Sequence, residues 1–300
     1  MAVSQSVINL LNLSLPALRQ LAKDMKVKTG PNPTKADLVR ALQNFPRTQL
    51  EAAVGDLLYA GNTSITWIRI GEGKGFTVKE LKTAISALEP NDPFEQELRP
   101  TSITHTPSLV EARQPDSTKV TLTFVYRKRM QTYLRDFEIK TIYGDDFFPV
   151  IVRPEHGVFE IRASHDLARL LEQTWLRSLA EVMEEPIAYR LISIEDFNKL
   201  RKKLGAVLDI YKGKDAEGSI YDTREWSKAK TCTDLAAEAR FQTDTKELEA
   251  VSQDILFVDD DPDHPVRLRV SANGSVWFRT VVSEAVIDRA YSALRSVGAV

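Results

Sequence analysis

The feature that most constrains the fold of this 300-residue chain is a run of short β-like segments followed by an amphipathic helix, and it occurs twice. Strands that come together in a run, rather than in alternation with helices, indicate an α+β fold with antiparallel strands. The predicted strands are 120–126, 135–143, 149–152 and 158–163 in the first copy and 255–258, 266–270 and 276–282 in the second, and the helices begin at Ser164 and Ser283.

The two copies also share residues. Pro149–Arg153 followed by Gly157 parallels Pro265–Arg269 followed by Gly274. The step from glycine to capping serine is 7 residues in the first copy and 9 in the second, and a difference of two keeps the same face of a strand inward. We therefore expect an internal repeat over about 118–183 and 252–297, with two curved antiparallel sheets and helices on one side.

The length exceeds that of a usual single domain, so we expect more than one. Residues 1–88 are predicted to form a small helical domain with a short strand over 65–70. Residues 89–117, rich in Pro, Ser, Thr and acids, are predicted to be a linker, and 118–300 the duplicated β-sheet body. Between the copies we expect helices over 194–208 and 234–250 and a loop over 212–218.

Composition excludes several classes. Charged residues make up 27% of the chain, and no apolar run approaches the roughly 18 residues that predict a membrane span. The first residues lack the pattern of a secretion signal, so we expect an intracellular protein. The single cysteine, Cys232, allows no intramolecular disulfide, and with only four histidines we expect no structural zinc, no other metal and no cofactor.

The segment Leu13–Phe45 carries the clearest helix punctuation. Ser14 is predicted to cap a first helix, which Gly30 and the following prolines end. Thr34 and Asp37 have the spacing of a capping box that opens a second helix. Two short helices joined by an extended loop are therefore expected.

This segment is also basic. Residues 1–47 contain seven basic side chains and two acidic ones, within a chain whose net charge is only −2. A phosphate-binding face requires such a local excess of positive charge. The alternative is an ordinary amphipathic helix pair with lysines in solvent.

The leucine-rich first helix, Gly30 and the run Thr34-Lys35-Ala36-Asp37-Leu38-Val39 resemble the SAP motif, a helix-extension-helix unit of DNA-associated proteins. The sequence differs from that motif in having Pro31-Asn32-Pro33 between the glycine and the cap. The resemblance implies that Lys28, Thr34 and Lys35 approach DNA phosphates. Free N–H groups at a helix start attract anions, which agrees with this role, and Arg40 belongs to the same basic set.

A second basic cluster lies in the first strands of the body. Arg127, Lys128 and Arg129 are its centre, and Tyr126 and Tyr133 alternate with it. Basic and aromatic side chains on strands can bind a nucleic-acid backbone and stack on bases. The alternative is a hairpin whose charges protect an edge from aggregation.

The order of elements, together with Trp67-Ile68-Arg69-Ile70, faintly resembles the centromere protein N family of the kinetochore, whose C-terminal region is saddle-like. That resemblance favours a nucleic-acid or chromatin partner, or an adaptor role without DNA contact. A third possibility is a Mg²⁺-dependent nuclease that uses Glu138 and Lys140 with Asp116 upstream.

Three other patterns have structural explanations. Gly71, Gly73 and Gly75 fit no phosphate-loop spacing and predict a flexible turn. Ser164-His165-Asp166 predicts a helix cap rather than a catalytic group, and the acidic run 259–263 predicts a solvated turn. We therefore expect a non-enzymatic protein that binds double-stranded DNA through its backbone, with the C-terminal domain for a second nucleic-acid or protein contact. A protein-interaction scaffold remains the alternative.

Overall fold

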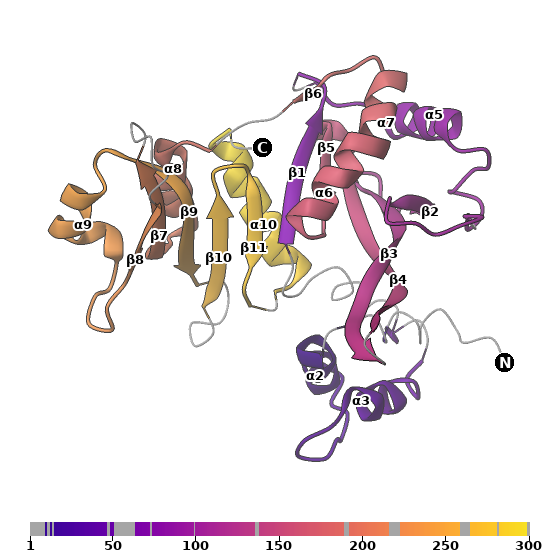
Figure 1. Ribbon diagram of the computed structural model, residues 1–300, viewed down its shortest axis with the longest axis horizontal. Coiled ribbons are helices and arrows are strands. Elements are labelled where there is room, and N and C mark those ends of the chain that lie inside the picture. Colours follow the sequence, from indigo (N-terminus) through magenta and orange to yellow (C-terminus); the bar gives the residue numbers. More distant parts are fainter. Residues whose placement is uncertain are drawn as a thin grey trace. The chain divides into compact units, whose positions relative to one another are not determined.

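A computed structural model of the chain describes residues 10, 13, 15–46, 49–50, 64–72, 74–98, 100–135, 138–188, 192–215, 223–258, 265–280 and 282–298. The fold is α+β, as predicted: a small N-terminal helical region precedes a body of antiparallel strands (Figure 1). The chain divides into two compact units. The first comprises Met1–Thr63, Ile192–Ala272 and Val276–Ala299, and the second is essentially Ser64–Leu191.

The N-terminal helical region contains helices α2 (Leu15–Asp24) and α3 (Lys35–Leu42). Leucines at helical spacing pack into a core of their own, formed by Leu10, Leu13, Leu18, Leu21, Ala22, Leu38, Val39, Leu42 and Leu50.

Helix α2 ends earlier than predicted. Lys26 takes a left-handed conformation (φ 54°), and the backbone N–H of Val27 reaches back to the carbonyl of Ala22 (2.8 Å). This turn satisfies the last carbonyls of the helix before the chain arrives at Gly30. Gly30 and the prolines therefore lie in the extension and do not end the helix. The predicted cap Ser14 lies outside the described residues.

The second unit has a sheet in the order β2-β3-β4-β5-β1, and the short strand β6 pairs with β1. Its helices follow or precede these strands in the chain. The elements are β1 (Ser64–Ile70), α5 (Val78–Leu88), β2 (Ser108–Arg113), β3 (Val120–Arg135), β4 (Glu138–Arg153), η1 (Pro154–His156), β5 (Val158–Ile161), α6 (His165–Leu171), the π-helical turn η2 (Glu172–Leu176), α7 (Arg177–Val182) and β6 (Ile187–Ala188).

The core of this unit lies between the sheet and helices α5, α6 and α7 (Figure 1). Phe124 of β3 is paired with Phe148 of β4, and their rings stack at 5.7 Å between centroids. Trp175 of η2 packs edge-on against Phe124 at 5.1 Å. Alternate strand residues thus bury one face of the sheet under the helices, as a half-covered antiparallel sheet requires.

Two expectations for this unit differ from the structure. Within the predicted linker 89–117, strand β2 pairs with β3, and Ala112 donates to the carbonyl of Pro93 (2.9 Å). Residues 138–143 and 149–152 of the two predicted strands lie in one continuous strand, β4, because Asp145 and Asp146 pair across the ladder with Arg127 and Tyr126 instead of forming a turn. Arg135, the predicted start of the first, is the last residue of β3.

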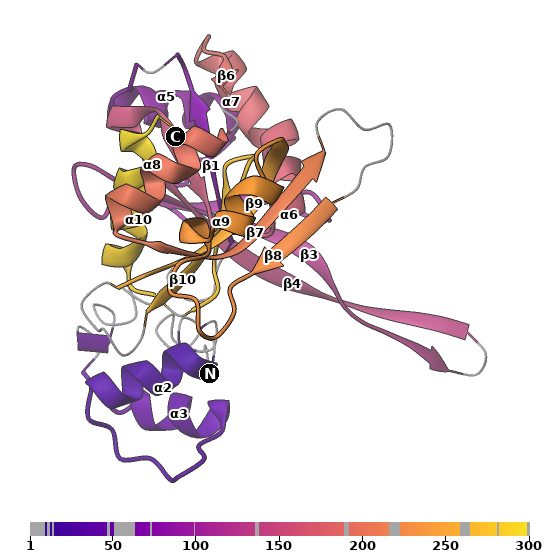
Figure 2. The ribbon, with the colours of Figure 1, turned by 90° about the vertical axis from the view of Figure 1, so that its left-hand side faces the viewer.

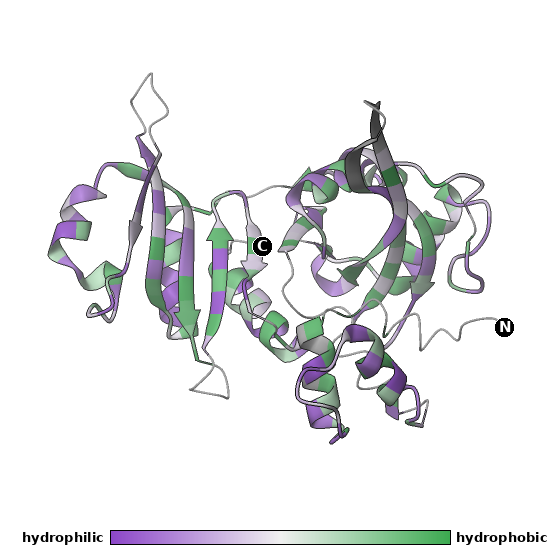
Figure 3. Cartoon of the chain, turned by 60° about the horizontal axis from the view of Figure 1, so that its bottom comes forward, coloured by the Kyte–Doolittle hydropathy of each residue, from purple (hydrophilic) through white to green (hydrophobic). Residues whose placement is uncertain are grey.

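The sheet of the first unit has the order β8-β7-β9-β10-β11. Its strands alternate between hydrophobic and hydrophilic residues (Figure 3), and helices α8 and α10 lie against one face (Figure 2). The elements are α8 (Ile194–Leu204), β7 (Val207–Asp215), β8 (Thr223–Ser227), η3 (Leu235–Ala237), α9 (Ala239–Asp244), β9 (Leu248–Phe257), β10 (Val266–Ser271), β11 (Ser275–Phe278) and α10 (Glu284–Ser296).

The predicted helix 234–250 is mostly wrong, since only α9 is α-helical and β9 begins at Leu248. Helix α9 ends where the hydroxyl of Thr245 donates to the carbonyl of Phe241 (2.7 Å). The loop predicted over 212–218 is wrong for 212–215, because β7 continues to Asp215 in pairing with β9, and its remaining residues lie outside the described ones. Strand pairing, which the local sequence does not reveal, decided both segments.

The two segments predicted as a repeat have the same element order: β3-β4-β5 and then α6, and β9-β10-β11 and then α10. Ser164 and Ser283 cap the two helices, as predicted. Gly157 (φ 64°) and Gly274 (φ 82°) take the left-handed conformation that each turn requires. In this alignment Arg153 matches Arg269, and Arg162 matches Arg279.

Candidate nucleic-acid interface

The start of α3 is closed by the predicted capping box. The backbone N–H and the hydroxyl of Thr34 donate to Oδ2 of Asp37 (3.0 and 2.6 Å), and the N–H of Asp37 donates to the hydroxyl of Thr34 (3.3 Å). These bonds from Thr34, with a smaller contribution from the charge of Arg40, hold the pKa of Asp37 below its usual value. The side chain of Thr34 is therefore committed to the cap.

Lys28 in the extension, Lys35 at the start of α3 and Arg40 in its last turn are all exposed. Within residues 15–46, as far as the structure describes them, none of the three forms an ion pair. The first two N–H groups of α3, at Lys35 and Ala36, have no acceptor inside the helix because of its geometry. The exposed side chain of Lys35 and the unused backbone donors are thus available together at the start of α3.

The second predicted cluster lies on a two-stranded arm formed by β3 and β4, which extends away from the rest of its unit (Figure 2). Arg127 contacts Asp145 (3.6 Å) and Lys128 contacts Asp146 (2.9 Å). Arg129 is exposed opposite Tyr143. Two of the three predicted basic residues are therefore already balanced by carboxylates.

Sequence reasoning missed Asp145 and Asp146 because it counted charges only as far as Lys140. Pairing of β3 with β4 places Asp145 opposite Arg127 and Asp146 opposite Tyr126. From residue 119 to 146 the sequence has six basic residues and four acidic ones: Lys119, Arg127, Lys128, Arg129, Arg135 and Lys140 against Asp136, Glu138, Asp145 and Asp146. The Asp145-Asp146 pair was the available signal, since opposite charges favour cross-strand positions.

The arm also carries exposed apolar side chains. Met130, Ile142, Tyr143 and Phe147 are each between 48% and 63% exposed. The ring of Tyr143 lies edge-on against His105, at 5.4 Å between centroids. Several large apolar groups on one projecting ribbon are typical of a contact surface.

A buried ionic cluster lies on β1, β5 and the C-terminal end of β4. Glu160 of β5 is fully buried and accepts hydrogen bonds from Arg153 (2.9 Å), Arg162 (2.5 Å) and the indole of Trp67 (3.2 Å). Burial alone would raise the pKa of Glu160, but the two guanidinium groups outweigh it and hold the pKa below the usual value. The cluster fixes β1, β4 and β5 to one another.

The nuclease arrangement does not assemble. Asp116 precedes β3 and Glu138 follows its far end, so the 16-residue strand separates them by roughly 50 Å. Asp116 is also committed to a turn, accepting from Thr118 and Lys119. Among the described residues no three His, Cys, Asp or Glu side chains group as metal ligands. The side chains of Glu138 and Lys140 lie outside the part of the chain that the structure describes. The acidic run 259–263, predicted as a solvated turn, also lies outside the described residues.

The glycine run has a packing role. A Cβ on Gly75 would lie 2.0 Å from the carbonyl oxygen of Glu155, so only glycine allows this close approach of two backbones. Ser164 accepts from the N–H of Leu167 as a helix cap (3.4 Å).

Neither a protein-family model nor a curated protein matches this chain. In the described part of the chain, every helix is too short or too polar to cross a lipid bilayer.

Proposed function

We propose that this protein binds double-stranded DNA through the phosphate backbone, with the helix-extension-helix module of α2 and α3 as the principal contact. The observation that carries the proposal is that Lys28 in the extension, Lys35 at the start of α3 and Arg40 in its last turn are exposed. Within the described residues none of the three forms an ion pair, although the charge of Arg40 acts on the carboxylate of Asp37. The positive side chains and the N–H groups of Lys35 and Ala36 are the kinds of donor that bind phosphate oxygens.

The arm contributes a weaker contact in this proposal. Asp145 and Asp146 offset Arg127 and Lys128, which leaves Arg129 as the cation best placed for a phosphate. Binding of this kind is independent of base sequence and falls steeply as salt rises. The protein would then be intracellular, and nuclear or associated with a nucleoid.

Fluorescence anisotropy with a labelled 30-base-pair duplex tests the proposal. The variant Lys28→Glu/Lys35→Glu/Arg40→Glu should lose more than tenfold in affinity, and its salt dependence should be shallower by about 3 in log–log slope. The matched control is Lys199→Glu/Lys202→Glu/Lys203→Glu on α8, which reverses the same number of exposed charges. Absence of wild-type binding at low salt, or equal losses in both variants, contradicts the proposal.

A second candidate function is protein docking through the arm, favoured by the exposed side chains of Met130, Ile142 and Phe147. In a cross-linking experiment, replacing these three residues by serine should abolish the cross-links between the arm and a partner protein. The affinity for DNA should stay unchanged. A loss of DNA affinity in this variant would instead assign the apolar residues to base stacking.

A further inference from the structure

Three arginines lie on one face of the sheet in the unit that contains β7 to β11. Arg267 and Arg269 alternate in β10 with Leu268, which is buried on the opposite face with the helices. Arg279 follows β11, and its N–H donates to the carbonyl of Arg267 (2.9 Å), which places it beside β10. Arg267 and Arg269 are therefore roughly 6.6 Å apart along the strand, with Arg279 on the neighbouring chain.

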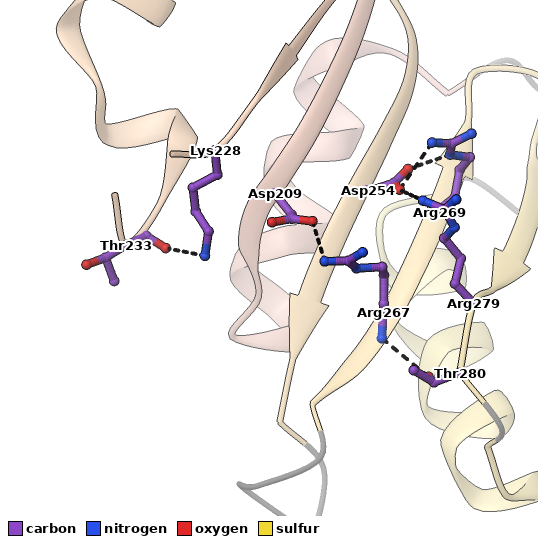
Figure 4. Close-up of polar contacts among 8 residues, drawn as sticks. All are labelled: Asp209, Lys228, Thr233, Asp254, Arg267, Arg269, Arg279 and Thr280. Atoms are coloured by element: carbon purple, nitrogen blue, oxygen red, sulfur yellow. Dashed lines mark hydrogen bonds and ion pairs between the residues drawn. The ribbon is translucent and has the colours of Figure 1, made fainter. Parts of the chain in front are cut away.

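Two carboxylates, those of Asp254 and Asp209, form ion pairs with these arginines (Figure 4). Arg269 binds Asp254 through Nε (2.5 Å) and Nη2 (3.2 Å), and Nη1 of Arg279 binds the same carboxylate (2.8 Å). Nη2 of Arg267 binds Asp209 (2.8 Å). A guanidinium carries five N–H donors, and these pairs use one or two of them.

The exposures differ between the acids and the arginines. The side chains of Asp254 and Asp209 are 1% and 12% exposed, whereas those of Arg269, Arg279 and Arg267 are 30%, 31% and 40% exposed. The negative charges are therefore covered, and the positive groups reach solvent. The face has a positive outer layer although its ion pairs are nearly balanced.

The matching cluster of the other unit shows that exposure is not required by the ion pairs. Arg153 and Arg162 hold the matching positions, but they are only 10% and 1% exposed and enclose Glu160. A purely structural pair of arginines can be buried in this fold. The arginines of β10 and β11 keep their guanidinium groups at the surface.

Trp277 adds an aromatic group to the same face. The guanidinium groups of Arg279 and Arg269 lie 4.7 and 5.9 Å from its ring centroid, which restricts their orientation. Towards the edge of the sheet, Lys212 of β7 lies opposite Glu225 of β8, whose charge also acts on Arg269. Glu225 therefore limits the positive face on its β8 side.

We propose that the arginine face, formed by Arg267, Arg269, Arg279 and Trp277, is a second site that binds the sugar-phosphate backbone of a nucleic acid. Guanidinium groups fixed by covered carboxylates present further N–H donors to phosphate oxygens with little loss of side-chain entropy. The proposal does not depend on the α2–α3 module, because the site uses other residues and its own electrostatics.

The test uses the full chain and the same labelled duplex, with the variant Asp254→Asn/Arg269→Gln/Arg279→Gln. This variant removes the acid together with both arginines, so no buried charge is left unpaired. Affinity should fall several-fold, and the salt dependence should be shallower by about 2 in log–log slope. Asp209→Asn/Arg267→Gln gives an independent second variant that should also weaken binding.

The outcomes separate this site from the α2–α3 module. Loss of affinity in the arginine-face variants, with no effect of Lys28→Glu/Lys35→Glu/Arg40→Glu, supports this site and contradicts the proposed function. Unchanged affinity and salt slope in folded arginine-face variants overturns this inference alone. Displacement of the duplex by polyglutamate at equal charge concentration would assign the face to an acidic peptide and overturn the nucleic-acid assignment.

Discussion

Arg153 of β4 and Glu160 of β5 form an ion pair of 2.9 Å in which the carboxylate is fully buried. The pair is seven residues apart in sequence and spans the turn at Gly157, so it fixes the register of two strands. Arg162 completes the cluster from the other oxygen of the same carboxylate. The buried charge of Glu160 is tolerated only while Arg153 and Arg162 neutralise it.

Glu160→Gln should therefore destabilise the protein by about 3–5 kcal/mol, because two buried guanidinium groups lose their counter-charge. Urea unfolding followed by circular dichroism measures this. The control is Glu155→Gln, whose side chain is 79% exposed and which should change stability by less than about 0.5 kcal/mol. A loss below about 1 kcal/mol in Glu160→Gln would show that the cluster is not needed for stability.

The effect of Glu160 should also depend on pH. Its folded pKa lies below the unfolded value of about 4.3, so its contribution is present above that pH and is lost as the pH falls through the folded pKa. The stability difference between wild type and Glu160→Gln should therefore shrink between about pH 5 and the acid limit of folding. Urea midpoints measured over that range check this, and a constant difference would contradict it.

Glu172, in the π-helical turn, should behave in the opposite way. Burial raises its pKa, although Arg169, Arg177 and His165 oppose the rise. The folded state therefore holds the proton more tightly, and the cost of ionising Glu172 sets in as the pH rises from about 4.3 through the folded pKa. Glu172→Gln should raise the melting temperature by roughly 1–3 °C at pH 7.5 and by less at pH 4.5. A rise at pH 4.5 as large as at pH 7.5 would exclude titration as the cause.

Gly75→Ala should cost about 1–3 kcal/mol or more, since its methyl group would overlap the backbone at Glu155. Gly30→Ala is the matched control, because nothing lies within 4 Å of a Cβ at that position. It should change stability by less than about 1 kcal/mol. Urea unfolding of both variants measures the contrast, and equal effects would mean that the loop shifts to admit a methyl group.

Thr34→Ala should destabilise α3 by about 1 kcal/mol through loss of the cap, while Thr34→Ser should retain it. Amide hydrogen exchange at Leu38 to Leu42 measures the change, since exchange in this helix should accelerate about fivefold. Unchanged exchange in Thr34→Ala would show that Asp37 holds the helix start by itself.

Local sequence determined the elements whose signals are local. The capping box of Thr34 and Asp37, the caps Ser164 and Ser283, the leucine faces of α2 and α3 and the strand-then-helix order were all predicted, because a cap or an amphipathic period is decided within a few residues. The same patterns indicated the α+β class and the module proposed to bind DNA.

Tertiary structure decided whatever depends on residues far apart in the chain. Only strand pairing brings Asp145 to Arg127, Asp254 to Arg279 and Trp67 to Glu160, and only pairing turned part of the predicted linker into β2 and part of a predicted helix into β9. The net charge of a surface depends on these partners, because a cation beside an exposed carboxylate attracts a phosphate far less than a free one does. The sequence therefore located basic segments, and the fold determined which of their charges remain available for a ligand.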